Sequence, residues 1–83
     1  MTTQELQRMT DRSFHEHIAE VYWHIAHYKD QELAQIRSAN EFKGALWPSM
    51  QRHCMKRADI NRKVHTRLQA WVEKQIRLRY EIK

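Results

Sequence analysis

Apolar residues follow a helical repeat through the first half of the chain. Their spacing alternates between four and three residues, which is typical of a helix that buries one narrow face. The repeat consists of Phe14, Ile18, Val21, Ile25 and Tyr28. Ser13 and Glu16 stand at its start in the arrangement of a capping box. The pattern therefore predicts a helix over about 13–28.

The segments on either side of this stripe break its phase. Residues 1–12 contain Leu6 and Met9, which are out of phase with the stripe, and we predict a short helix or flexible arm there. The stripe lapses at Lys29 and Asp30, and Asp30 is suited to cap a second helix over about 30–43. One continuous helix with a phase shift is the alternative.

The clearest break in the chain lies between Gly44 and Pro48. Glycine can close a helix in the left-handed conformation, and proline favours the first turn of the next helix. We predict a third helix over about 48–82, which Asp59 would divide if it caps a separate segment. Polar residues intrude on the apolar arc of this helix, as expected for a partly wet seam between helices. The arc comprises Ile60, Val64, Leu68, Trp71, Val72, Leu78 and Ile82.

The composition points to helices only. The chain has 83 residues with one glycine and one proline, which disfavours a turn-rich β fold. We predict an all-α fold in which three or four helices form a small hairpin or bundle, with residues 13–83 as a single domain. Because so short a chain buries a small core and Cys54 has no disulfide partner, we expect homodimerisation to complete the fold. We expect Cys54 to be a buried structural thiol in a soluble cytoplasmic protein with no membrane partner.

Charge divides the chain in two. Residues 1–43 carry five basic and seven acidic side chains, and residues 44–83 carry ten and three, which gives −2 and +7 and the total of +5. Six cations of the last helix fall within about a quarter turn of one another, over about 37 Å of helix. They are Arg52, Lys56, Lys63, Arg67, Lys74 and Arg77, which we call the basic stripe. The stripe predicts a small regulatory protein that binds nucleic acid through phosphate contacts.

Two other interpretations of the basic stripe remain open. A solvated helix face rich in lysine and arginine serves solubility alone, and Asp59 on the same face weakens the phosphate hypothesis. The stripe also suits an inhibitor or adaptor that docks on an acidic surface of a larger nucleic-acid-processing enzyme. In that case Phe42 and Trp47 would anchor the partner, unless they only plug the angle between two helices.

A third hypothesis rests on histidines. Glu20, His24 and His27 lie at helical spacings that let neighbours share a metal ion, which would make the protein responsive to metal or pH. We predict no cofactor and no enzyme activity, because the sequence contains no phosphate loop, nucleophile motif or paired carboxylates.

Finally, we expect the acidic half to pack against the basic half. Pairing of the stripe with Glu16, Glu20 or Glu32 would remove the support for phosphate binding.

Overall fold

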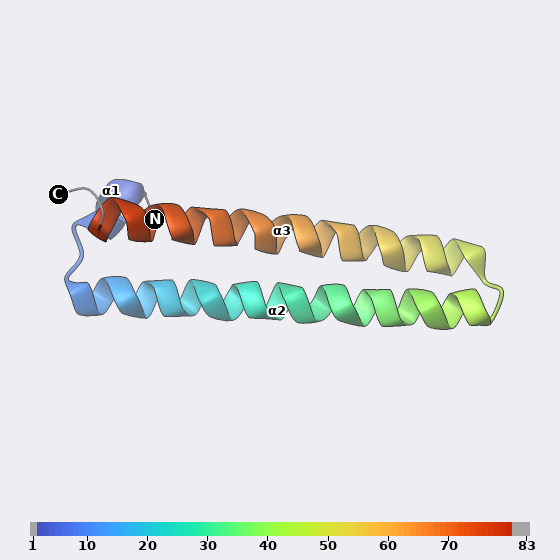
Figure 1. Cartoon of the computed structure of the whole chain (residues 1–83). Helices are drawn as coiled ribbons and strands as arrows, with labels where there is room; N and C mark the ends of the chain where they lie inside the picture. The colour runs from blue at the N-terminus through green and yellow to red at the C-terminus, as the bar shows by residue number, and fades with distance from the viewer. Residues whose placement is uncertain (1, 81–83) are drawn as a thin grey trace.

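The computed structural model describes residues 2–80, which form three α-helices and no strand. They are α1 (Thr3–Gln7), α2 (Asp11–Gly44) and α3 (Pro48–Tyr80). The predicted all-α class is confirmed. The two long helices lie antiparallel, side by side, in a particle of 56 × 19 × 18 Å (Figure 1). The predicted end of the third helix at residue 82 lies outside the described residues.

A heptad seam joins α2 to α3 along their whole length. On each helix the seam residues alternate at spacings of three and four, and every one of them is buried or half-buried. On α2 they are Phe14, Ile18, Val21, Ile25, Tyr28, Glu32, Gln35, Ala39 and Phe42. On α3 they are Cys54, Ala58, Asn61, His65, Leu68, Val72, Gln75 and Arg79. Cys54 is buried, as predicted.

The seam changes character from one end to the other. Its apolar cluster lies near the chain termini and comprises Leu6, Phe14, Ile18, Ile25 and Val72, with Met9, Val21, Leu68, Trp71 and Ile76 packed against it. Toward the turn, the buried residues are the small Ala39, Cys54 and Ala58. The half near the turn therefore buries less apolar surface.

The predicted break between residues 28 and 30 does not exist, because α2 is one helix of 34 residues. The seam continues in phase through polar residues, of which Glu32 is held by His65, whose Nε2 lies 2.8 Å from Glu32 Oε1. The apolar residue Leu33 does not mark the buried face of α2 at this level, since it is 52% exposed. The third helix is also undivided, and Asp59 lies within it.

Thr10 begins α2. Its Oγ1 accepts a hydrogen bond from the Ser13 backbone N–H at 3.2 Å, so the helix starts at Asp11. The predicted start at residue 13 is therefore two residues late, and Ser13 lies in the first turn. In the same way, Thr2 caps α1 by accepting from the backbone N–H of Glu5.

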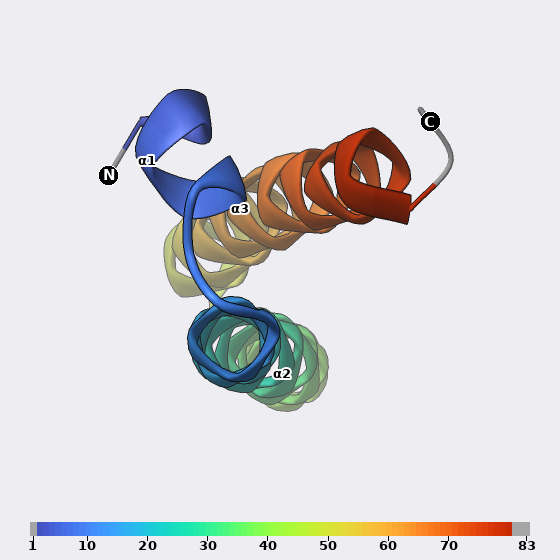
Figure 2. The same ribbon diagram turned by 90° about the vertical axis from the view of Figure 1, so that its left-hand side faces the viewer.

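The segment before α2 contains a short helix, α1, which agrees with the first of the two predicted alternatives and not with a flexible arm. This helix folds back beside the end of α3 (Figure 2) and buries Leu6 completely. Gln7 Nε2 donates to Gln75 Oε1 at 3.2 Å, and Gln75 Nε2 donates to Thr3 Oγ1 at 3.3 Å. These bonds satisfy the fully buried Gln75 side chain, which fixes α1 to α3.

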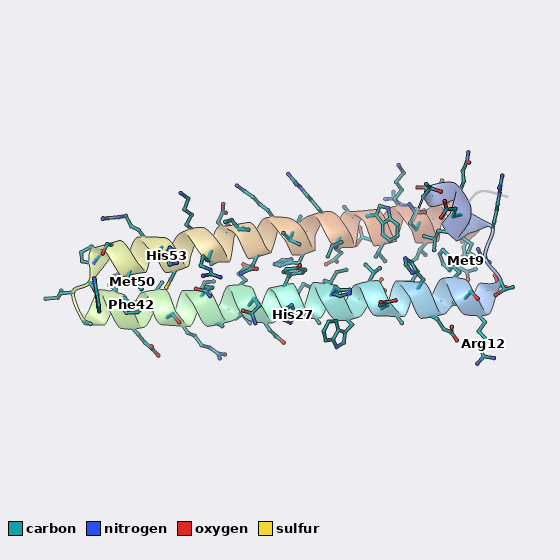
Figure 3. All side chains as sticks on the ribbon, turned by 180° about the vertical axis from the view of Figure 1, so that it is seen from behind. Met9, Arg12, His27, Phe42, Met50 and His53 are labelled. Carbon is teal, nitrogen blue, oxygen red and sulfur yellow. The ribbon has the colours of Figure 1, made fainter. Side chains whose placement is uncertain are left out.

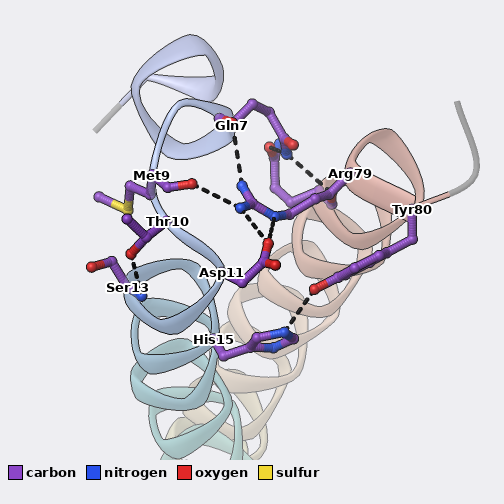
Figure 4. A network of polar contacts seen from close by, with 9 residues as sticks. Gln7, Met9, Thr10, Asp11, Ser13, His15, Arg79 and Tyr80 are labelled. Carbon is purple, nitrogen blue, oxygen red and sulfur yellow. Dashed lines mark hydrogen bonds and ion pairs between the residues drawn. The ribbon is translucent and has the colours of Figure 1, made fainter. Parts of the chain in front are cut away.

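Arg79 clamps the connection between α1 and α2 (Figure 4). Its Nη2 donates to the backbone oxygen of Met9 and to Asp11 Oδ1, both at 2.7 Å, and its Nη1 donates to the backbone oxygen of Gln7 at 3.2 Å. The guanidinium also lies 4.5 Å from the centre of the Phe14 ring. One side chain of α3 therefore holds three parts of the N-terminal segment.

The turn between the long helices is a Schellman motif with leucine in the position that usually holds glycine. Trp47 N–H donates to the Phe42 carbonyl at 2.9 Å, and Leu46 N–H donates to the Lys43 carbonyl at 3.1 Å. Leu46 has φ 56°, whereas Gly44 does not have a positive φ and belongs to α2. The predicted role of Gly44 is therefore wrong. The predicted start of the next helix at Pro48 agrees with the structure.

Candidate nucleic-acid interface

The basic stripe lies on the outer side of α3. All six of its residues are exposed, and Figure 3 shows long nitrogen-tipped side chains projecting from α3 away from α2. The heptad explains this placement, because none of the six falls on a seam position. The seam and the stripe are therefore different faces of one helix.

Most of the stripe has no acidic partner among the residues that the structure describes. Within residues 2–80, Lys63 is the one stripe residue in an ion pair, with its Nζ 3.0 Å from Asp59 Oδ2. Asp59 also accepts a hydrogen bond from Arg62. The bonds from Arg62 and Lys63 lower the pKa of Asp59 below its usual value, and the bond to Asp59 raises the pKa of Arg62. The charge of Lys63 is thus partly neutralised within α3.

The expected packing of the acidic half against the basic half occurs without using the stripe. In the described part of the chain, Asp11 of α2 forms an ion pair with Arg79 of α3, and Glu32 shares a hydrogen bond with His65. Glu16 pairs with Arg12 on its own helix, at 3.1 Å. The predicted neutralisation of the stripe by Glu16, Glu20 or Glu32 is therefore absent among residues 2–80.

The structure does not assemble the predicted metal ligands. No group of three or more His, Cys, Asp or Glu side chains within residues 2–80 has the arrangement needed to hold a metal ion. Around Glu20, the rings of His24 and His27 pack on Trp23 instead, with the His27 ring stacked at 5.7 Å between centroids. Aromatic contacts account for these histidines.

The predicted anchor residues Phe42 and Trp47 meet at the turn. Their rings form an edge-to-face contact with 5.7 Å between centroids, which supplies the apolar contact that accompanies a Schellman motif. Trp47 nevertheless remains 55% exposed, and Leu46 is 87% exposed. The contact packs the turn, but Leu46 and Trp47 still expose apolar surface at this end of the helix pair.

An open apolar groove of about 640 Å³ runs beside the seam, and the sequence did not single it out as a site. It is lined by His17, Val21, Val64, Arg67, Leu68 and Trp71. The His17 ring stands edge-on to Trp71 at 6.4 Å between centroids. The spacing of Val64, Leu68 and Trp71 is visible in the sequence, but only the packing shows that the seam leaves part of this arc uncovered.

Comparisons of the chain with protein-family models, with curated proteins and with solved structures give no significant match. Over residues 2–80, no helix has both the length and the apolar character that a membrane span requires.

Proposed function

We propose that this protein binds the phosphate backbone of nucleic acid through the basic stripe of α3 and acts as a small regulatory protein. The observation that supports this proposal is that five of the six stripe residues are exposed and have no ion-pair partner within residues 2–80. Unpaired lysines and arginines on one rigid helix are suited to displace counterions from a phosphate backbone. The stripe spans about 37 Å, close to one turn of duplex DNA.

The test is binding to labelled double-stranded DNA and RNA, measured by fluorescence anisotropy at about 50 and 200 mM salt. We expect a log–log salt slope near −5 if all six stripe residues contact phosphates. Replacing Lys56, Lys63 and Arg77 with glutamate should abolish binding at the lower salt. No binding by the unmodified protein would refute the proposal.

A matched control separates local contacts from net charge. Replacing Lys29, Arg37 and Lys43 on α2 with glutamate changes the net charge by the same amount, and all three residues are exposed. If nucleic acid meets the α3 face, this variant should keep most of the affinity. Equal loss in both variants would indicate attraction by net charge alone and would contradict a defined interface.

The exposed tip favours a second candidate function, an inhibitor or adaptor for an acidic protein surface. Leu46 and Trp47 are exposed at the end of the helix pair, where buried apolar anchors would supply affinity and the stripe would steer encounter. Partner capture that survives nuclease treatment and fails after Trp47→Ala would support this function. Capture that nuclease abolishes would support nucleic-acid binding.

We also propose that the protein is a homodimer, in which two helix pairs form a bundle. The accessible surface is 6483 Å², whereas a compact monomer of this mass exposes about 5,300 Å². An elongated pair of helices therefore leaves more surface in water than a single domain of this size normally does, and a second copy would bury part of it.

A further inference from the structure

The groove beside the seam is a concave surface lined mainly by apolar side chains. Val21, Val64, Leu68 and Trp71 line it and are each half-buried against the seam, so their outer sides face solvent. Ile60 extends the same side of α3 by one turn beyond Val64 and is 55% exposed. The contact between α2 and α3 therefore leaves part of this apolar row in water.

The two rims of the groove carry opposite charge. On α2, Glu20 lies one turn from His17 and therefore on the same side of the helix. On α3, Arg67 lines the groove and Lys74 lies two turns further on. None of these three charged residues has an ion-pair partner within residues 2–80. The groove thus presents an acidic rim beside a basic one.

The charges select one way of packing two such grooves together. A two-fold axis parallel to the helices places α2 of each copy over α3 of the other, with every neighbouring helix antiparallel. A two-fold axis across the helices would place α3 against α3 and bring the basic rim of one copy, with Arg67 and Lys74, against the basic rim of the other, which like-charge repulsion opposes. Only the first arrangement sets the acidic rim against the basic rim.

Internal contacts show which residues lie level with one another. Asp11 and His17 meet Arg79 and Trp71, and His15 and Glu32 meet Tyr80 and His65. Counted along the antiparallel helices, these four contacts place Glu20 level with residues 68–77 of α3, a range that contains Lys74. With the axis parallel to the helices, height is unchanged between copies. Glu20 of each copy therefore faces Lys74 of the other.

We infer that a second copy of this chain occupies the groove, with its α2 over the first copy's α3, and that Glu20 and Lys74 pair twice across the interface. A standard interface buries about 800 Å² on each partner. The surface of this chain exceeds that of a compact monomer by about 1,200 Å², which is enough to supply it. The inference rests on the proposed homodimer. It uses Arg67 and Lys74 of the basic stripe, so that Arg52, Lys56, Lys63 and Arg77 remain for phosphate contacts in the dimer.

Analytical ultracentrifugation over about 1–200 μM protein tests the interface. We expect the unmodified chain to sediment as a dimer and Ile60→Lys to raise the dimer dissociation constant at least about tenfold. Met55→Lys is the control, because this substitution adds the same charge at a residue that is 48% exposed and lies on the other flank of α3. A monomer at every concentration, or equal weakening by both variants, would overturn the inference.

A charge exchange tests the orientation. Glu20→Lys and Lys74→Glu should each weaken the dimer, and the double variant should restore it because the pairs are re-formed with reversed sign. Failure of the double variant to recover would contradict this arrangement. Circular dichroism of each variant confirms that the helices are intact, and anisotropy with nucleic acid is measured separately, so that loss of dimer and loss of nucleic-acid binding are distinguished.

Discussion

Glu32 and His65 meet in the middle of the seam, with Oε1 of the glutamate 2.8 Å from Nε2 of the histidine. Both side chains are less than one-fifth exposed, at 18% and 12%. The pair occupies seam positions that hold apolar residues nearer the termini. Hydrogen bonding across the seam therefore replaces apolar contact at this level of the molecule.

Removing one partner of this pair should destabilise the protein. His65→Ala leaves the half-buried Glu32 carboxylate without its hydrogen bond, and we expect a loss of about 1–3 kcal/mol in the free energy of unfolding. Urea denaturation followed by circular dichroism measures it. His53→Ala, at an exposed histidine of the same helix, is the control and should change stability by less than about 0.5 kcal/mol. Equal effects would show that the pair contributes nothing specific.

Arg79 should stabilise the N-terminal segment far more than its neighbour Arg77 does. Arg79→Ala removes charge-assisted hydrogen bonds to Met9 and Asp11 and the contact with Phe14, and we expect a loss of about 2–4 kcal/mol. Arg77→Ala, at an exposed position, should cost less than about 0.5 kcal/mol. Trypsin should also cleave the Arg79 variant faster after Arg8. Unchanged cleavage at Arg8 would mean that other contacts hold α1.

Leu46 has a positive φ, and replacing it with glycine should stabilise the protein. Leu46→Gly relieves the cost of a positive φ and loses little contact, since Leu46 is 87% exposed, so the free energy of unfolding should rise by about 0.5–1 kcal/mol. Leu46→Ala keeps the Cβ and therefore should not give this gain. Equal stability of the glycine and alanine variants, measured by thermal unfolding, would contradict strain at this residue.

Gly44 should tolerate a side chain. It is helical, and a Cβ added there meets no atom within 4 Å. Gly44→Ala should therefore stabilise the protein by up to about 1 kcal/mol through helix propensity. Thermal unfolding measures the change, and a loss of stability would indicate that the turn needs glycine at this position.

The stabilising effect of Asp59 should disappear in acid. Its pKa is lowered in the folded protein by Arg62 and Lys63, so its contribution is present above the ordinary value of 3.8 and is lost as the pH falls through the folded pKa. Asp59→Asn should lower the melting temperature slightly near neutral pH, and this difference should shrink as the pH falls below 3.8. A difference that persists in acid would assign the effect to something other than the carboxylate charge.

The sequence by itself determined the helical class, the start of α3 at Pro48 and the face of α3 that carries the basic stripe. These features depend on local chemistry: the scarcity of glycine and proline, the ring of Pro48, and the angular spacing of residues along a helix. The stripe from Phe14 to Tyr28 was equally visible, because an apolar repeat in one helix is a property of that segment alone.

Only the tertiary structure decided how far each face continues. Glu32 keeps α2 in phase because His65 of α3 faces it. Likewise, α1 is packed because Gln75 and Arg79 bind it from about seventy residues away. Leu46 takes the left-handed conformation because the turn must bring the two long helices back along one seam. Each of these outcomes depends on groups distant in the chain, whose proximity a local pattern does not contain.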